Sequence, residues 1–389
     1  MSRIEQLIEE LCPEGVEYKE LGEIAKISTG KLNANAMTLD GLYPFFTCSE
    51  KPYLIDTFAF DTEAILISGN GSQLGHINYY NGKFNAYQRT YVICEFSTNI
   101  TASYLLHFLK GFLKEYIWKN VKEGSVPYIT LPMLQNFQIP LPPLPIQQEI
   151  VRILDTFTAL DGSLQAELEA RRKQYEHYRN QLLNFDGKEV EWKTLGEVGE
   201  FKYGFTDIAK DFGNIRFVRI TDINENGKLR VNDCKYLDLT EDNKAYLISR
   251  GDILMARTGA TYGKTMLFNE DYPAVYASFL IRIRFKVKNI IPEYYWHFSQ
   301  SGIYWVQANK LVGGGAQPQF NANVLKTIQI PIPPLSEQER IVGILDKFDA
   351  LVASTSSATG GIPAEIAARR KQYEYYREKL LSFEIKGNK

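Results

Sequence analysis

The segment IPLPPLPIQQEIVRILDTFTAL, residues 139–160, decides the fold because the chain contains it twice. It returns as IPIPPLSEQERIVGILDKFDAL at residues 330–351, where 14 of the 22 positions are identical. A second segment, AELEARRKQYEHYRNQLLNF at 166–185, returns at 364–383 with 14 of its 20 positions identical. The period of about 190 residues is far longer than that of a solenoid repeat, so the pattern indicates a tandem duplication.

The sequence outside these constant segments differs between the two copies. Residues 16–24 return at 190–198 with six of nine positions identical, and a weak echo connects 65–72 with 253–260. Elsewhere the copies hardly resemble each other, so each half consists of a divergent globular region followed by a constant segment. The chain is therefore predicted to contain a first domain, a central helix, a second domain and a distal helix, at 1–146, 147–185, 186–335 and 336–389.

Each constant segment is predicted to form a long amphipathic helix. It follows a Pro-Pro pair, which cannot continue a helix, and its apolar residues then recur at alternating spacings of three and four. The second copy carries seven additional residues in a Ser/Thr/Gly-rich stretch, so we expect its helix to break near 354–363. Two such helices in one chain favour an antiparallel coiled coil with an internal pseudo-twofold axis.

The positions expected to form the coiled-coil core or to contact a partner share this spacing or belong to the repeated Arg-Arg-Lys-Gln-Tyr-Glu motif. In the first copy they are Ile150, Leu154, Phe157, Leu168, Arg171, Arg172, Tyr175, Tyr178, Leu182 and Phe185. In the second copy they are Ile366, Arg369, Arg370, Tyr373, Tyr376, Leu380 and Phe383. The motif has three interpretations, which are a phosphate clamp, a solvated helix face beside the seam, and a docking surface for two identical partner subunits.

The two globular regions are predicted to be mixed α/β (α+β) domains with strand-rich cores. Runs rich in β-branched and aromatic residues at 64–67, 90–94 and 279–285 are separated by turn-forming residues, which is typical of strands. One helix is expected in each region, near 101–120 and 292–310.

Composition excludes several classes of protein. The chain of 389 residues has 44 Lys and Arg against 46 Asp and Glu, a net charge of −2, so any nucleic-acid surface has to be local. No apolar run approaches the roughly 18 residues of a membrane span, and the acidic start is unlike a secretory signal. The four cysteines are scattered without a CxxC pair, which favours reduced thiols and a cytoplasmic location.

The sequence lacks the motifs of catalysis, and we expect no enzymatic activity. Three residues separate Gly259 from Gly263, whereas the phosphate-binding loop requires four. The two Leu/Ile-Pro-Pro-Leu stretches lack the polar and aromatic residues of the amino-methyltransferase motif. The four histidines have no metal-ligand spacing, so we expect ordinary surface or hydrogen-bonded histidines and no metal site.

Two divergent domains joined by constant helices suit DNA as a target. Half-sites about one helical turn apart, roughly 34–36 Å, require two reading domains at a fixed separation with a twofold relation between them. A helix pair of this length can set such a distance.

The doubled I-P-[LI]-P-P-L and A-E-[LI]-x-A-R-R-K-Q-Y-E blocks resemble the specificity subunit of Type I restriction-modification systems. The resemblance covers essentially the whole chain and is strongest at 139–185 and 330–383. It implies that the globular regions are target-recognition domains, each of which reads one half of a bipartite site in double-stranded DNA. It also implies that the coiled coil sets the spacer between the halves and docks two modification (methyltransferase) subunits, which are joined by two restriction subunits. S-adenosylmethionine, ATP and Mg²⁺ are then implied for those partners, and no cofactor for this chain.

The residues expected to contact DNA have side chains that suit base edges or phosphates. In the first domain they are Lys31, Asn33, Asn70, Ser72, Gln73, Gln88, Arg89 and Lys122. In the second domain they are Lys202, Tyr203, Arg216, Arg219, Arg257, Thr258, Thr261, Lys264, Gln317 and Gln319. For each of them the alternative is a solvated polar side chain.

Two other functions compete with sequence-specific DNA binding. A non-catalytic protein–protein scaffold explains two binding heads on a helical spacer, but it does not explain why near-identical helices accompany divergent heads. A self-contained DNA methyltransferase would itself bind S-adenosylmethionine, and the missing cofactor and catalytic motifs disfavour it.

Overall fold

The chain forms two compact units, each of which contains one of the divergent domains. Unit 1 consists of Met1–Gly162 with Ala368–Lys389, and unit 2 of Ser163–Ala367. The division falls within both long helices, whereas the sequence placed the domain boundaries near the helix ends. Each unit therefore combines one globular domain, the beginning of the helix that follows it, and the end of the other constant helix. The computed structural model describes residues 2–120, 127–258, 262–311, 320–353 and 360–387.

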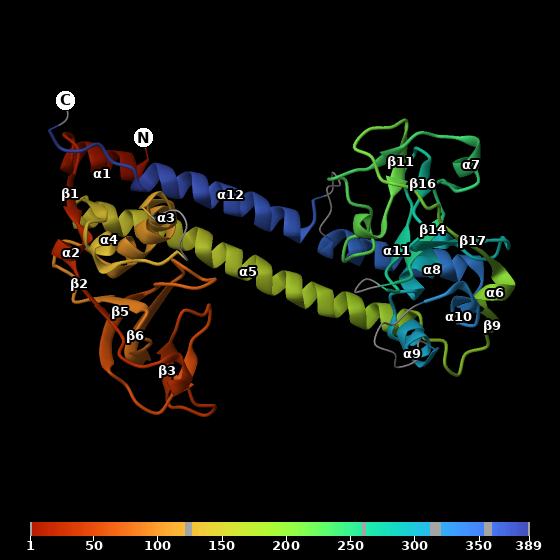
Figure 1. Ribbon diagram of the computed structural model, residues 1–389, viewed down its shortest axis with the longest axis horizontal. Helices are drawn as coiled ribbons and strands as arrows, with labels where there is room; N and C mark the ends of the chain where they lie inside the picture. Colours follow the sequence, from red (N-terminus) through yellow and green to blue (C-terminus); the bar gives the residue numbers. More distant parts are fainter. Residues whose placement is uncertain (1, 121–126, 259–261, 312–319, 354–359, 388–389) are drawn as a thin grey trace. The chain divides into compact units, whose positions relative to one another are not determined.

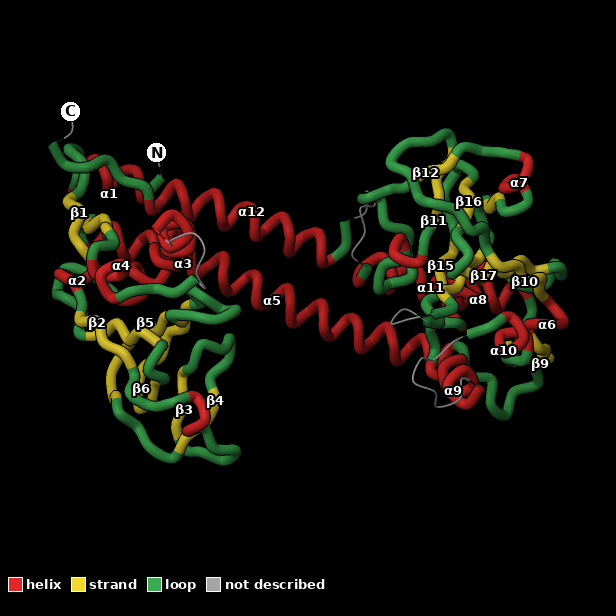
Figure 2. Tube along the Cα trace, in the orientation of Figure 1, coloured by secondary structure: helices red, strands yellow, loops and turns green. Residues whose placement is uncertain are grey.

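Unit 1 contains a six-stranded sheet with the strand order β2-β7-β5-β6-β3-β4. Figure 2 labels β2, β5, β6, β3 and β4 of this sheet. The strands predicted at 64–67 and 90–94 lie in its β5 and β7, and the helix predicted near 101–120 is α3. The elements of this domain are α1 (Arg3–Leu11), β1 (Glu17–Glu20), α2 (Leu21–Ile24), β2 (Lys26–Thr29), η1 (Ala34–Ala36), β3 (Tyr43–Phe46), β4 (Tyr53–Ile55), β5 (Phe60–Ser68), β6 (Ile77–Ala86), β7 (Thr90–Cys94), α3 (Ala102–Asn120), α4 (Leu131–Gln135) and β8 (Gln138–Leu141).

Both faces of this sheet are covered, which explains the unbroken apolar sequence of its central strand. Ile65 and Ile67 of β5 pack in the core that contains α3, whereas Leu66 packs in a second cluster with Phe46 and Phe84. Successive side chains of a strand point to opposite faces, so a strand buried on both faces has no polar alternation.

Unit 2 repeats this plan with one strand interrupted. Its two four-stranded sheets have the orders β10-β17-β14-β15 and β12-β11-β16-β13. In unit 1 the long strand β6 pairs with both β5 and β3, whereas in unit 2 β15 pairs with β14 and β16 pairs with β11. The elements are β9 (Glu191–Thr194), α6 (Leu195–Val198), β10 (Gly199–Tyr203), β11 (Ile215–Val218), η2 (Ile220–Asp222), β12 (Tyr236–Leu237), α7 (Glu241–Lys244), β13 (Leu247–Ile248), β14 (Ile253–Ala256), β15 (Thr265–Leu267), β16 (Ala274–Tyr276), β17 (Leu280–Phe285), α8 (Pro292–Phe298), α9 (Gly302–Leu311), α10 (Ala322–Lys326) and β18 (Gln329–Ile332).

The strand predicted at 279–285 is β17, and the weak echo between 65–72 and 253–260 reflects the equivalence of β5 and β14. The single helix predicted near 292–310 is wrong in one respect, because α8 and α9 are separate helices there. Ser299 and Ser301 stand between them, and their hydroxyls donate to the carbonyls of Trp296 and Phe298. These local hydrogen bonds compete with a continuous helix.

The constant segments form the helices that their apolar spacing predicts. Helix α5 (Leu144–Leu182) is continuous over 39 residues and passes through Gly162. The second copy is divided into α11 (Leu335–Val352) and α12 (Ile362–Leu381), and the sequence predicts a break near 354–363. Residues 354–359 of the break lie outside the described residues.

Helices α5 and α12 pack against each other in antiparallel directions. In unit 1 the ring of Phe157 stacks on that of Tyr376 at 5.6 Å, and Arg370 forms an ion pair with Asp161 at 2.8 Å. In unit 2 Leu164 packs with Ile366. Residue numbers thus rise along α5 as they fall along α12, which confirms the predicted antiparallel coiled coil.

At the outer parts of the predicted helix seam, the apolar side chains pack into the cores of the globular domains. Ile150 and Leu154 belong to the core of unit 1 together with residues of α2 and α3, and Tyr175 belongs to the core of unit 2. The deepest positions at the helix ends are Leu183 and Leu381, one residue later than predicted. Of the other predicted core positions, the half-buried ones are Phe157, Leu168, Leu182, Tyr373, Tyr376, Leu380 and Phe383. Phe185 and Phe383 lie just beyond a helix end, and Tyr178 is partly exposed with its ring on Phe348.

The end of the chain returns to its beginning within unit 1. The Val16 amide donates to the Glu384 carbonyl at 2.9 Å, and the Tyr18 hydroxyl donates to the Phe383 carbonyl at 2.9 Å. Helix α1 accordingly lies beside the last part of α12, and its Ile4 packs in the same core as Leu381 (Figure 1). The residues that follow α12 contact the globular domain of unit 1, and the residues that follow α5 pack in the core of unit 2. This equivalence agrees with the internal duplication.

Candidate nucleic-acid interface

Three loops of unit 1 meet where the strands β2, β5 and β7 begin or end. The Gly30 amide donates to the Thr90 carbonyl at 3.4 Å, and the Gln88 amide donates to the Leu32 carbonyl at 2.9 Å. The Gly69 amide donates to the Arg89 carbonyl at 2.9 Å. We call the loops 30–33, 69–76 and 87–90 the loop cluster of unit 1, and it brings together most of the DNA contacts predicted for the first domain.

Two glycines allow these loops to approach each other so closely. A Cβ atom added at Gly30 would lie 1.8 Å from the Ala86 carbonyl oxygen, so no other residue fits there. Gly75 closes the 69–76 loop with a φ of +77°, a left-handed conformation that glycine adopts without steric cost. The glycines therefore shape the surface, and the longer side chains of the cluster provide its chemistry.

The polar side chains of this cluster are largely accessible. Arg89 is exposed, and Gln88 is exposed and donates from Nε2 to Oδ1 of Asn33 at 2.9 Å. Asn70 is half-buried and its backbone pairs with that of Tyr128. The remaining predicted contacts that lie exposed on these loops are Lys31, Ser72 and Gln73.

The equivalent loops of unit 2 form the same cluster with different side chains. The Gly204 amide donates to the Leu280 carbonyl at 3.1 Å, and the Arg257 amide donates to the Phe279 carbonyl at 3.1 Å. Arg257 therefore occupies the place of Gly69, and Phe279 the place of Arg89. We call the loops 203–205, 257–264 and 277–280 the loop cluster of unit 2, with 259–261 outside the described residues.

Arg257 and Tyr203 form the aromatic part of this second cluster. The Arg257 guanidinium lies 5.2 Å from the ring centre of Tyr203 and 5.7 Å from that of Phe279. The Tyr203 hydroxyl accepts a hydrogen bond from the Ala322 amide at 2.9 Å. An arginine held between two aromatic rings is positioned in advance, and its planar end can form paired hydrogen bonds with a guanine edge.

A family model described as "Type I restriction modification DNA specificity domain" matches residues 13–170 and again residues 187–366. The two matches cover most of the chain and correspond to its two copies. The chain belongs to the family of Type I restriction-modification specificity subunits.

Known specificity subunits resemble this one over most of its length. It is 37% identical over 291 residues to the EcoR124I/EcoR124II specificity subunit of Escherichia coli, over 71% of this chain and 67% of that one. It is 30% identical over 364 residues to the EcoDI specificity subunit of Escherichia coli, over 85% of this chain and 80% of that one. The crystal structure of the S subunit from M. genitalium shares the fold, with a TM-score of 0.59 and 16% identity over 94% of this chain and 96% of that chain.

As a specificity subunit, the chain is the DNA-specificity component of a Type I restriction-modification complex, and a non-catalytic one. Its two globular domains are its target-recognition domains. Both the resemblance inferred from the doubled segments and the predicted fold class are thereby confirmed.

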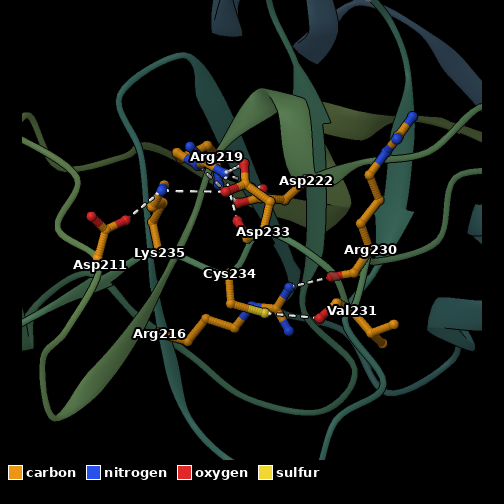
Figure 3. A network of polar contacts seen from close by, with 9 residues as sticks. All are labelled: Asp211, Arg216, Arg219, Asp222, Arg230, Val231, Asp233, Cys234 and Lys235. Carbon is orange, nitrogen blue, oxygen red and sulfur yellow. Dashed lines mark hydrogen bonds and ion pairs between the residues drawn. The ribbon is translucent and has the colours of Figure 1, made fainter. Parts of the chain in front are cut away.

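Arg216 of the specificity subunit is committed to packing inside its domain (Figure 3). The residue is buried in β11, and its guanidinium donates to the Tyr272 hydroxyl at 2.8 Å and to the Arg230 carbonyl. The sequence-based prediction of a DNA contact overlooked this, because a single arginine in a strand gives no sign of the face to which it points. We therefore leave Arg216 out of the proposed interface.

Arg219 lies in a network of ion pairs that also includes Lys235 (Figure 3). Its side chain bonds to Asp222 at 2.8 Å and to Asp233 at 3.3 Å, and the hydrogen bond with Asp222 raises the pKa of the guanidinium. Lys235 bonds to Asp211 at 2.5 Å. Hydrogen bonds from Lys235 and Arg219 lower the pKa of Asp233. Because these charges are paired with one another, Arg219 stabilises the loop between β11 and β12. Like Arg216, it is not included in the proposed interface.

The other predicted contacts of the second domain have varied surroundings. The Lys202 ammonium donates to the Ala245 carbonyl at 2.7 Å and lies 4.2 Å from the ring centre of Tyr246, so it is tied to its own domain. Thr258 and Lys264 are half-buried on the second loop cluster. The predicted contacts that fall outside the described residues are Lys122, Thr261, Gln317 and Gln319.

The repeated Arg-Arg-Lys-Gln-Tyr-Glu motif presents some of its charges to solvent. Arg172 is exposed on α5, and its counterpart Arg370 on α12 is exposed although it pairs with Asp161. Arg171 donates to Gln174 at 3.0 Å. Arg369 also contacts Gln372.

Sequence reasoning missed two strongly exposed apolar side chains, one in each target-recognition domain. Leu39 and Phe212 are 96% and 86% exposed, and they lie in equivalent loops because Thr38 bridges Leu54 in unit 1 as Lys210 bridges Tyr236 in unit 2. An apolar residue in a turn carries no pattern that separates a contact residue from a buried one. Exposed apolar groups on a DNA-binding domain suit thymine methyl groups.

Two features are absent from the part of the chain that the structure describes. Within those residues, no three His, Cys, Asp or Glu side chains gather in a way that could hold a metal ion. No helix among them is both long and apolar enough to cross a membrane.

Proposed function

We propose that each loop cluster reads one half of a bipartite site in double-stranded DNA. The observation that carries this proposal is that one backbone framework occurs in both units with different side chains. In the loop cluster of unit 1 the arginine is Arg89, on the 87–90 turn. In the loop cluster of unit 2 it is Arg257, on the loop equivalent to 69–76. Equivalent frameworks with different reading side chains suit two half-sites of different sequence.

The chemistry of the two clusters supports contact with both bases and phosphates. Arginine, asparagine and glutamine can form paired hydrogen bonds with base edges, whereas lysine, serine and backbone amides suit phosphate oxygens. Since the net charge of the chain is −2, attraction to DNA depends on these local groups. Binding by the complex is then expected to weaken steeply as the salt concentration rises.

The helix pair is proposed to set the spacer between the half-sites and to dock two modification subunits. At about 1.5 Å per residue, the 39 residues of α5 extend over about 58 Å, enough to separate two readers by more than one turn of DNA. The exposed Arg172 and Arg370 lie at equivalent positions of the two helices. Two identical partners need two equivalent surfaces, and the repeated motif supplies them.

Further partners and cofactors complete the proposed assembly. Two restriction subunits join the complex for cleavage, and S-adenosylmethionine, ATP and Mg²⁺ bind to the modification and restriction subunits. The complex acts in the cytoplasm, where it meets its DNA target.

A methylation map tests the proposed function. The chain is co-expressed with its modification subunit, and methylated bases are located across the host genome by single-molecule sequencing. The expected result is a split motif with two short specific halves around a nonspecific spacer. If a stable complex forms and no methylation motif emerges, the result favours a protein–protein scaffold instead.

Replacing Arg89 by Ala is expected to weaken binding of the complex to its DNA site by about 1–3 kcal/mol. Arg89 is exposed on the loop cluster and forms no ion pair with a described residue. Loss of a base contact relaxes one position of the motif, whereas loss of a phosphate contact weakens binding to all sequences and lowers the salt slope by about 1. Titration of duplexes with the complex at several salt concentrations measures both effects.

Lys26→Ala is the matched control for Arg89→Ala. Lys26 is also an exposed cation of unit 1, but it is paired with Glu95 at 2.6 Å and lies at the other end of β2. Its replacement is expected to leave the affinity within about twofold, since surface pairs contribute little. Equal affinities of the two variants would contradict a role of the loop cluster in binding.

A further inference from the structure

A histidine is buried at the same place in both target-recognition domains. His107 lies in α3 and His297 in α8, and both are buried. Nε2 of His107 lies 2.9 Å from Oδ1 of Asp155, and its Nδ1 lies 3.3 Å from the Tyr373 hydroxyl. Both ring nitrogens therefore have a partner outside the helix that carries the histidine.

The histidine of unit 2 repeats these contacts. Nε2 of His297 lies 2.9 Å from Oδ1 of Asp346, and its Nδ1 lies 3.1 Å from the Tyr175 hydroxyl. In each unit the histidine comes from the divergent domain, the aspartate from the helix that follows that domain, and the tyrosine from the other constant helix. One imidazole ring thus joins three elements that are far apart in the sequence.

The arrangement fixes the direction of each hydrogen bond. Burial lowers the pKa of His107, although the neighbouring Asp155 opposes this effect. A neutral imidazole has one donor and one acceptor nitrogen, and a carboxylate can only accept. Nε2 therefore donates to Asp155, and Nδ1 accepts from Tyr373. The hydrogen bonds to Asp155 and Tyr373 can therefore form together in only one orientation of the imidazole ring.

Other contacts at the same junction are also duplicated. The Tyr104 hydroxyl donates to the Pro140 carbonyl at 3.1 Å, and the Tyr294 hydroxyl to the Pro331 carbonyl at 3.0 Å. These tyrosines stand three residues before the histidines, in a Tyr-x-x-His-Phe pattern. The pattern is shared by two regions that otherwise differ in sequence, and each of its polar side chains faces a constant segment.

We infer that His107 and His297, with Tyr373 and Tyr175, are positioning residues that hold each target-recognition domain in one orientation on its two helix segments. The inference rests on the proposed bipartite reading. A rotation of either domain about its helix segments would move its loop cluster relative to the other half-site. The junction therefore restricts the spacer lengths that the complex accepts.

The test uses the complete complex with its modification subunits and a ladder of DNA duplexes. Each duplex carries both half-sites, at the mapped spacing or with one base pair added or removed. Tyr373→Phe keeps the ring and removes the hydroxyl, and it is expected to lower the preference for the mapped spacing by about fivefold, the effect of one hydrogen bond. Tyr375→Phe is the matched control, because Tyr375 is 60% exposed on the same helix and its loss of a hydroxyl should leave the preference unchanged.

A second pair of variants separates positioning from folding. His107→Ala removes both hydrogen bonds and is expected to relax the spacing preference further, whereas His107→Gln keeps an amide donor for Asp155 and should restore part of it. Melting temperatures of all complexes are measured in parallel. If methylation falls equally at every spacing together with the melting temperature, the role is merely structural and the inference is overturned.

The remaining outcomes distinguish this inference from the proposed function. A wild-type complex that methylates all spacings equally overturns the spacer role itself. If the wild-type complex prefers the mapped spacing and the Tyr373→Phe complex shows the same preference, the positioning role alone is overturned. Relaxed spacing with an unchanged pair of half-site sequences is the result that supports it.

Discussion

Exchange of residues 186–335 for the corresponding region of another specificity subunit is expected to replace one half of the methylated motif and to leave the other half unchanged. The described loops of the second cluster all lie in this stretch, and the loops of the first cluster lie within 30–90. Since the strands β9 and β18 at its two ends pair with each other, the exchanged region carries its own closing sheet. Methylation maps of the parent and the chimera, each with its modification subunit, measure the result.

The exchanged domain contacts residues of the constant helices, and these contacts allow a control for the exchange. Asp346, Tyr175 and Gln338 stay with the recipient chain, so the incoming domain has to supply the histidine that Asp346 and Tyr175 hold. A chimera in which that histidine is replaced by Ala should recognise the same new half-site with a relaxed spacer. Change in both halves of the motif after a single exchange would contradict independent reading by the two units.

The sequence alone predicts the architecture well because duplication and helix periodicity are strong patterns. The break between α11 and α12 follows from seven additional residues, and the strands β5, β7 and β17 follow from dense β-branched and aromatic runs. The division of α5 between two units could not be predicted in this way. The spacing of Ile150, Leu154 and Phe157 looks the same whether the apolar face meets another helix or a domain core. Only the fold decides that Ile150 enters the core of unit 1, whereas Phe157 stacks on a ring of α12.

The candidate site could be predicted only in part, because the sequence does not show which polar groups find partners within the protein. Arg89 directly precedes strand β7 and is exposed, whereas Arg216 lies within strand β11 and is buried beside Tyr272. The sequence predicts ordinary surface or hydrogen-bonded histidines, and the hydrogen bonds of His107 and His297 agree with the second of these descriptions. Their shared Tyr-x-x-His-Phe pattern is the signal that could have identified the junction before the structure.

Replacement of Gln147 by Leu is expected to destabilise unit 1 by about 3–5 kcal/mol, because three backbone groups lose their buried partner. Gln147 is fully buried, and its Nε2 donates to the Asn99 carbonyl at 2.8 Å and to the Pro142 carbonyl at 2.9 Å. Its Oε1 accepts from the Thr101 amide at 3.0 Å. For a unit of this size the melting temperature should fall by about 10 °C, which calorimetry of the purified chain can measure.

Gln148→Leu is the control, since it makes the same substitution at the neighbouring exposed position and should change stability by no more than about 0.5 kcal/mol. Gln338→Leu offers an internal replicate, because Gln338 forms the same three bonds, to Asn289, Pro333 and Ile291, in unit 2. Each variant should lower the unfolding transition of its own unit. A chain in which Gln147→Leu melts like Gln148→Leu would show that the Gln147 contacts do not hold the domain on α5.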